Sequence, residues 1–146
     1  MVQRGVKIAQ SRLCLKETYF KNERLARLGV EVMSFSHLRR RTTIRALCLP
    51  ERVHFYMLMF VTGGRGRHTV DCVTSAVSAG SLVLVRPGQV QRWHLQARYA
   101  AELVLFDPVA LHPARTSVTG FAGLAASPAC MRVPRACIAA FRSDLT

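Results

Sequence analysis

Residues 53–94 read VHFYMLMFVTGGRGRHTVDCVTSAVSAGSLVLVRPGQVQRWH, and this stretch decides the fold. Aromatic and β-branched residues dominate residues 53–62, which predicts a strand; both of its parities are apolar, so both faces should be buried. The glycine-rich segment 63–66 predicts a turn, because glycine adopts positive φ without strain. A second buried strand is predicted at residues 82–85, and a type II turn at Pro87-Gly88.

Further strands are predicted on both sides of this stretch. Residues 29–35 alternate loosely and are predicted as a strand, and residues 90–95 and 102–106 are predicted to continue the sheet until Asp107-Pro108 closes it. Many short strands with regularly spaced turns are typical of a β-sandwich or barrel. Pro134 then fits the first turn of a helix.

These signals predict one domain with four parts. Residues 1–28 are either a disordered N-terminal arm or residues upstream of the functional start. The other three parts are the β-barrel at 29–112, a linker rich in small residues at 113–133, and a helix that begins at 134 and runs to 146.

The composition restricts the class of protein. The chain has 146 residues, half of them hydrophobic, which is enough for one packed core. We find no apolar run long enough to span a bilayer and no secretory signal, so we expect a cytoplasmic protein without membrane contact. The five scattered cysteines indicate neither a disulfide framework nor a zinc site. The net charge of +13 indicates either a nucleic-acid surface or coding bias, since only three of the basic residues are lysines.

Four segments together carry a resemblance to a known family. They are GVEVMSFSHLRRR (29–41), HFYMLMFVTGGRGRHTVD (54–71), SAGSLVLVRPGQVQRWH (78–94) and AELVLFDP (101–108). In this order and spacing, the chain resembles the N-terminal cupin-like domain of AraC-type transcription regulators over roughly Gly29 to His112.

The resemblance implies both a fold and a function. The fold is a mainly β, cupin-like barrel (a double-stranded β-helix or jelly roll) with a short C-terminal helix. The function is ligand sensing and dimerisation. Family members contact DNA through a C-terminal helix-turn-helix unit. We find no such pattern after the barrel, so we expect a fragment truncated before its DNA-binding region. The alternative is a stand-alone cupin that binds a small molecule or is an enzyme.

Metal ligands are the first chemistry to test, because many cupins bind a metal through histidines. His54 has no histidine two residues away, since Arg52 and Tyr56 flank it, and Gln91 occupies the place of a later histidine ligand. A neutral amide is a poor ligand for a transition metal. We therefore expect no metal, no cofactor and no enzyme activity.

A small-molecule pocket remains as the predicted site. Ligand pockets are mostly apolar with a few fixed polar groups. The residues expected to contact the ligand, a sugar or other small polar metabolite, are His54, Tyr56, Arg86, Gln91 and Trp93. The ligand would favour one arrangement of the N-terminal arm or the linker helix.

The C-terminal helix is the predicted surface for self-association. Ile138, Phe141 and Leu145 form an apolar stripe on it, with little chain left to cover them. We therefore expect a homodimer.

Overall fold

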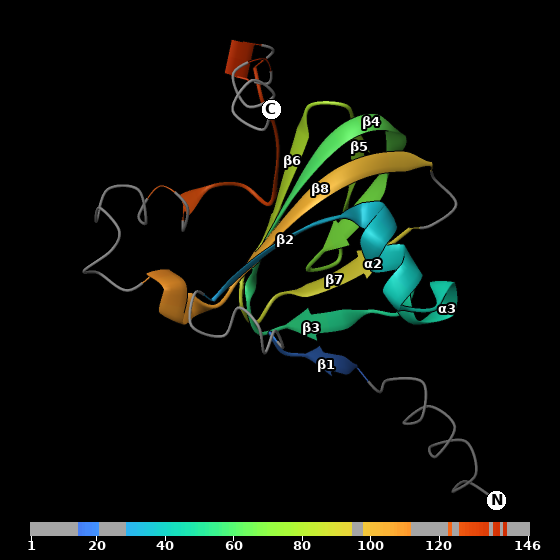
Figure 1. The fold of residues 1–146 in the computed structure, drawn as a ribbon, viewed down its shortest axis with the longest axis vertical. Coiled ribbons are helices and arrows are strands. Elements are labelled where there is room, and N and C mark those ends of the chain that lie inside the picture. Colours follow the sequence, from blue (N-terminus) through green and yellow to red (C-terminus); the bar gives the residue numbers. More distant parts are fainter. Residues whose placement is uncertain are drawn as a thin grey trace, which may run out of the picture.

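The computed structural model describes residues 15–20, 29–94, 98–111, 123, 126–134, 136, 137 and 139. They are mainly β, and the curled sheet forms the half-barrel drawn in Figure 1, which confirms the predicted cupin-like fold class. The strands are β1 (Lys16–Thr18), β2 (Val30–Ser34), β3 (Glu51–Val53), β4 (Tyr56–Val70), β5 (Val73–Ser78), β6 (Ser81–Val85), β7 (Val90–Trp93), β8 (Tyr99–Phe106) and β9 (Cys130–Arg132). The helices are α2 (Phe35–Arg41), α3 (Ile44–Leu47) and the 3-10 helix η1 (Pro108–Leu111).

Strand β4 is the centre of the sheet. Its first part pairs with β6 and β8 and its last part with β5 and β7, all antiparallel. The register to β8 shifts between Val61 and Gly63, where two residues of β4 oppose one of β8. Such a bulge bends a strand. One strand therefore belongs to both halves of the curled sheet.

The predicted turn at residues 63–66 is wrong, because this glycine-rich segment lies inside β4. The chain reverses later, at Asp71 and Cys72, whose φ angles are 48° and 66°. Two consecutive positive φ angles are typical of a type I′ turn, which matches the twist of a hairpin. The prediction at Pro87-Gly88 is confirmed: Gly88 has φ 88°, and the backbone N–H of Gln89 donates to the Arg86 carbonyl at 3.1 Å.

Gly64→Ala is expected to lower the free energy of unfolding by about 2–3 kcal/mol. The left-handed backbone contributes about 1–2 kcal/mol of this loss, and the steric overlap of the new Cβ contributes at least about 1 kcal/mol. Gly64 has φ +77°, and a Cβ there would lie 2.2 Å from the Arg98 carbonyl oxygen and 2.8 Å from the Tyr99 Cα. Both are backbone atoms and cannot rotate away. Denaturant titration measures the loss. Gly63→Ala is the control, because nothing lies within 4 Å of its Cβ. Equal losses in both variants would contradict this account.

The core lies on the inner face of the half-barrel. Along β3 and β4 every second residue from Glu51 to Val61 is buried, while the residues between them are half-buried. The chain bends at His54 and Phe55, which divides the predicted strand 53–62 into β3 and β4. The prediction of two buried faces therefore holds for one face only.

Helix α2 is anchored on the sheet by its first residue. Phe35 is 2% exposed, and its ring stacks between Trp93 of β7, at 4.8 Å, and Tyr99 of β8, at 5.1 Å. The helix begins at this residue because the Ser34 hydroxyl accepts the backbone N–H of His37 at 3.2 Å, an N-cap.

Two strands extend the sheet into segments predicted as arm and linker. Strand β1 lies parallel to β3, and β9 pairs antiparallel with β6. The predicted domain boundaries otherwise stay predictions. Ala136, Cys137 and Ala139 are helical, whereas the proposed dimer residues Ile138, Phe141 and Leu145 lie outside the described residues. Among the helices that the structure describes, none is long and apolar enough to cross a membrane.

Candidate ligand-binding site

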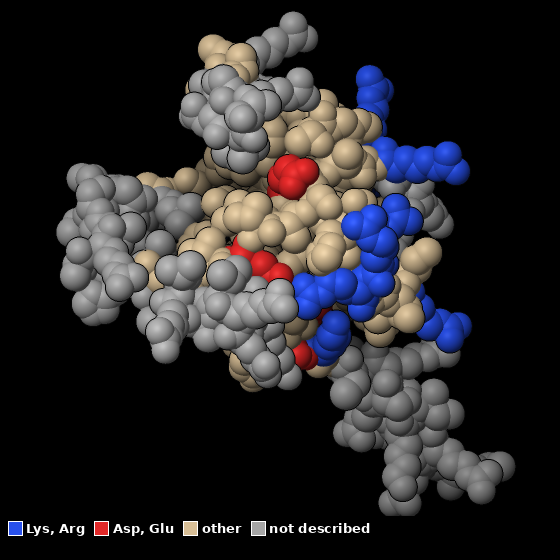
Figure 2. Space-filling view, viewed as in Figure 1, with Lys and Arg blue, Asp and Glu red and all other residues tan. Residues whose placement is uncertain are grey.

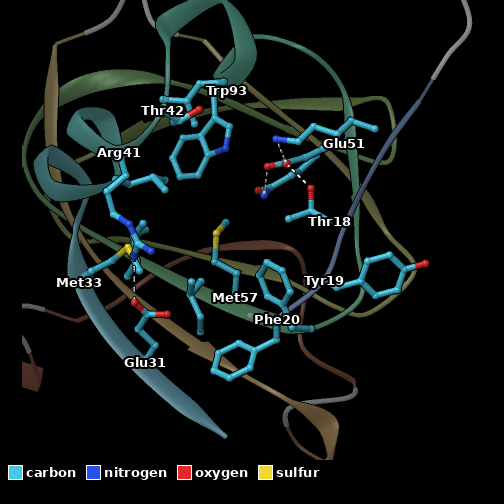
Figure 3. A pocket seen from close by; sticks show the side chains of 17 residues that line it. Thr18, Tyr19, Phe20, Glu31, Met33, Arg41, Thr42, Glu51, Met57 and Trp93 are labelled. Atoms are coloured by element: carbon cyan, nitrogen blue, oxygen red, sulfur yellow. Dashed lines mark hydrogen bonds and ion pairs between the residues drawn. The ribbon is translucent and has the colours of Figure 1, made fainter. Parts of the chain in front are cut away.

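A pocket of ≈ 260 Å³ lies between the β1 segment and the inner face of the sheet (Figure 3). This volume is close to the lower end of the range of about 300–1,000 Å³ for ligand pockets, so it suits a small molecule. Two polar groups reach the pocket, and Tyr19 and Thr42 also line it. The remaining walls are apolar, formed by Phe20, Met33, Leu38, Leu47, Phe55, Met57, Trp93, Leu103 and Leu105.

The Glu51 carboxylate is the centre of the first polar group. Its side chain is 11% exposed. Gln91 donates to its Oε1 through Nε2 at 3.0 Å, and Thr18 donates to its Oε2 through Oγ1 at 2.7 Å. The Lys16 ammonium lies 3.5 Å from the same Oε2. A buried carboxylate needs such partners, because it has lost its contacts with water. The partners come from two other strands, so the contacts of Glu51 connect β3 with β1 and β7.

His68 fixes the orientation of the Gln91 amide. Its Nε2 lies 3.0 Å from Gln91 Oε1, which can only accept, so Nε2 carries the proton. The ring is 1% exposed and meets Trp93 edge-on. Burial lowers the pKa of His68 from 6.5 to about 4, an effect that the Gln91 hydrogen bond partly offsets and His94 reinforces. The neutral imidazole therefore holds the Gln91 NH₂ toward Glu51.

The second polar group is an ion pair at another side of the pocket. Arg41 of α2 donates to Glu31 of β2, with 3.2 Å between Nη1 and Oε1. The Glu31 side chain is 17% exposed and that of Arg41 is 54% exposed; for Glu51 and Lys16 the values are 11% and 48%. In both pairs the acid is the less exposed partner. All four side chains line the pocket, so the two carboxylates are better shielded from water than the two cations.

One side of the molecule is basic. In the view of Figure 2, Lys and Arg side chains gather along the side that carries α2 and α3. The last turns of these helices hold Arg39, Arg40, Arg41 and Arg45. This clustering agrees with both interpretations of the net charge, a nucleic-acid surface and coding bias.

Two of the five sequence-predicted ligand residues line the pocket. Gln91 and Trp93 are alternate residues of β7, 2% and 1% exposed, and both face inward. The indole of Trp93 lies at the edge of the cavity opposite Phe20 and Met57 (Figure 3). Residues of one parity on a strand share a face, which is why the sequence identified both.

The other three predicted residues lie elsewhere. His54 contacts Glu17, with 2.5 Å between Nε2 and Oε2, and stacks on Tyr19 at 4.4 Å. Tyr56 stacks on Phe106 at 4.9 Å, and Arg86 donates to the Ser127 carbonyl. None of the three lines the pocket. His54 and Tyr56 are on the outer parity of the β3–β4 segment, and Arg86 follows β6.

The sequence analysis did not identify Glu51, His68 or the β1 segment as parts of the site. The signal for Glu51 is its parity, because it is two residues before the buried Val53 and four before the buried Phe55. No local signal connects Thr18 or Phe20 to the pocket. Phe20 reaches it by packing on Phe55, with 6.3 Å between ring centroids.

The described residues show no arrangement of side chains that could bind a metal ion. They contain no group of three or more His, Cys, Asp or Glu side chains that could hold an ion. Gln91, at the place where the resemblance implies a histidine ligand, instead bridges His68 and Glu51. The expectation that this chain needs neither metal nor cofactor stays a prediction.

A cupin-like half-barrel with a largely apolar pocket on its inner face defines a domain of the small-molecule-binding class. The model of the AraC-like ligand binding domain family matches residues 40–144, well over half of the chain. The chain therefore belongs to the family of AraC-like ligand-binding domains, which are regulatory and not typically catalytic. No curated protein matches the sequence.

Proposed function

We propose that this chain is the ligand-sensing domain of an AraC-type transcription regulator and that its effector binds in the pocket between β1 and the sheet. The observation that carries the proposal is a pocket with apolar walls and a few fixed polar groups, in a chain of this family. Gln91 and Trp93 keep their proposed role as ligand contacts, and Glu51, Thr18 and Phe20 join them. His54, Tyr56 and Arg86 are left out because they lie outside this pocket.

The β1 segment is the part through which a ligand would act. Thr18 bonds to Glu51 and Phe20 packs on Phe55, so residues before the barrel cover the pocket. On the outer side, Tyr19 stacks on His54, and Figure 3 shows its ring pointing away from the cavity. A ligand that fits better with β1 in one arrangement shifts the equilibrium toward it, by no more than its differential affinity.

Three further features stay predictions from the sequence. They are dimerisation through Ile138, Phe141 and Leu145, a cytoplasmic location, and DNA contact only through a C-terminal helix-turn-helix unit, for which we find no pattern in this sequence. We propose ligand binding for the residues that the structure describes. Transcription control is a proposal for the whole regulator to which such a domain belongs.

The pocket is tested by filling it. Leu105 is a partly buried residue of β8 that lines the pocket. We expect Leu105→Trp to weaken any ligand at least about tenfold, because the larger ring occupies the space that the ligand needs. Binding is measured as the rise in melting temperature in a screen of sugars, acids, amines and alcohols, since a ligand specific for the native state stabilises it.

Val104→Trp is the matched control for this variant. Val104 is the preceding residue of the same strand and does not line the pocket. Both variants are first compared with the wild type by circular dichroism. Ligands that bind all three proteins equally would place the effector site elsewhere and contradict the proposal.

A further inference from the structure

We propose that the pocket selects ligands with a cationic nitrogen, an ammonium or guanidinium group, on a small apolar body. The cation would pair with the Glu51 carboxylate and replace the Lys16 ammonium. This inference rests on the proposed function, because it names the chemical class of the effector for the same pocket. It narrows the sequence-based expectation of a sugar or other small polar metabolite.

The distribution of charge in the pocket is the first argument. The two carboxylates are the less exposed members of their ion pairs, and the two cations are the more exposed members. An anionic ligand inside the pocket would meet both carboxylates in a poorly solvated space, which is costly. A cationic ligand would meet the same carboxylates as partners.

The orientation of Gln91 is the second argument. Its Oε1 is already bound by His68 Nε2, and its Nε2 donates to Glu51 Oε1. The amide cannot be reversed without leaving the His68 N–H without an acceptor. The Glu51 Oε1 is therefore occupied from within the sheet. The position left for a ligand is Oε2, where Thr18 and Lys16 now bind.

Lys16 is the third argument, since it already supplies a cation at this position. Lys16 and Glu51 face each other in the parallel register of β1 and β3, with 3.5 Å between Nζ and Oε2. The Lys16 side chain is 48% exposed, so its ammonium returns to water when it leaves Glu51, and a ligand ammonium in its place keeps the buried carboxylate paired. A ligand ammonium could therefore displace Lys16 at small cost. Its apolar body would lie among Phe20, Phe55 and Met57, which line the pocket beside Glu51.

Neutral polyols fit this pocket less well. A sugar buries many hydroxyl groups, and each one needs a hydrogen-bond partner when it leaves water. Aliphatic and aromatic side chains form most of the pocket wall. The Glu51 carboxylate, a strong acceptor in such a pocket, matches a charged donor on an apolar ligand.

The experiment compares matched probes by thermal shift and titration calorimetry. Benzylamine and cyclohexylmethylamine are the amines; benzyl alcohol, cyclohexylmethanol and benzoate have the same bodies without the cation. We expect the amines to bind at least about tenfold more tightly than the alcohols, and benzoate not to bind, because a hydrogen bond to a buried charge is strong. Equal affinities, or a preference for benzoate, would overturn the proposal.

Three variants test the role of Glu51. Glu51→Gln keeps the size and removes the charge, so the preference for amines should be lost. Glu102→Gln, on β8 outside the pocket lining, should preserve it. Lys16→Met removes the competing ammonium and should strengthen amine binding several-fold. The Lys16→Met variant also tests the proposal if Glu51→Gln does not fold. Unchanged or weaker amine binding in Lys16→Met would show that the ligand does not replace the Lys16 ammonium.

The outcomes separate this proposal from the proposed function. If alcohols or acids bind better than amines and Leu105→Trp blocks them, the pocket is the site and the cation selectivity is wrong. If amines bind but Leu105→Trp does not weaken them, both proposals fail for this pocket.

Discussion

Replacing Phe35 by alanine is expected to lower the free energy of unfolding by about 3–5 kcal/mol, the usual cost of removing a fully buried aromatic ring. The ring is 2% exposed and stacks on two others, at 10° to the plane of Trp93 and 5° to that of Tyr99. Such aromatic pairs stabilise by about 0.5–1.5 kcal/mol beyond their buried area. The loss should therefore lie in the upper part of the range.

The position of Phe35 gives the same substitution a second effect. Phe35 is the first residue of α2, and the same helix supplies Leu38 and Arg41 to the pocket. Without the ring, α2 loses its anchor on β7 and β8. Ligand binding in the pocket should weaken together with stability.

Urea denaturation of the wild type and three variants checks this prediction. Ile44→Ala is the control, because Ile44 of α3 is 57% exposed and its loss should cost less than about 1 kcal/mol. Phe35→Leu keeps an apolar side chain and should lie between the wild type and Phe35→Ala. If Phe35→Ala is no less stable than Ile44→Ala, the stack does not hold the helix to the sheet.

The fold was predictable because its signals are local. Short strands rich in β-branched and aromatic residues, and the Pro87-Gly88 turn, follow from neighbouring residues in the sequence. The glycine-rich segment was misinterpreted, because the same residue type serves both turns and bulges. The actual hairpin turn at Asp71 and Cys72 contains no glycine, and Asp71 is its only residue typical of turns, so the sequence signal for it was weak.

The site was predictable only in part because its contacts depend on strand register. Gln91 and Trp93 were found by their spacing within one strand. His54 and Tyr56 were selected in the same way, as polar and aromatic residues of one parity on a barrel strand. Both parities around them are apolar, so parity alone does not distinguish the inner face from the outer. Which parity faces inward follows from pairing with β6 and β8, which are far away in the sequence.

The polar network shows the same dependence on register. Glu51 lies opposite Lys16 of β1 on one side and opposite Gln91 of β7 on the other. His68 joins through the pairing of β4 with β7, where it lies opposite Trp93. Four strands therefore supply the network, and a single sequence without contact information does not specify their register.

Acidification is expected to destabilise the domain through His68. The pKa of this histidine is lowered from 6.5 to about 4 in the folded protein, chiefly by burial. Between these pH values the unfolded chain binds a proton that the folded chain does not. The contribution to stability is therefore complete above about pH 6.5 and is lost as the pH falls toward about 4. At about 1.36 kcal/mol per pKa unit, the full loss is about 3 kcal/mol, of which about 2 kcal/mol should appear between pH 7 and pH 5.

The physical reason is the surroundings of the imidazole. Nε2 donates to Gln91, and Nδ1 is a buried atom without a hydrogen-bond partner. Protonation would place a second N–H at Nδ1, with no acceptor beside it, and a positive charge in the core next to Trp93. Protonation of His68 is therefore less favourable in the folded protein than in the unfolded chain, and acid shifts the equilibrium toward unfolding.

Denaturant titrations at pH 7 and pH 5 of the wild type, His68→Gln and His37→Gln test this cause. Glutamine at position 68 can still donate to Gln91 but does not titrate, so His68→Gln should lose about 2 kcal/mol less than the wild type between the two pH values. His37 is an exposed residue of α2, and its variant should keep the wild-type dependence on pH. If all three proteins lose the same free energy of unfolding, another group causes the acid sensitivity, because only the His68 variant lacks the buried imidazole.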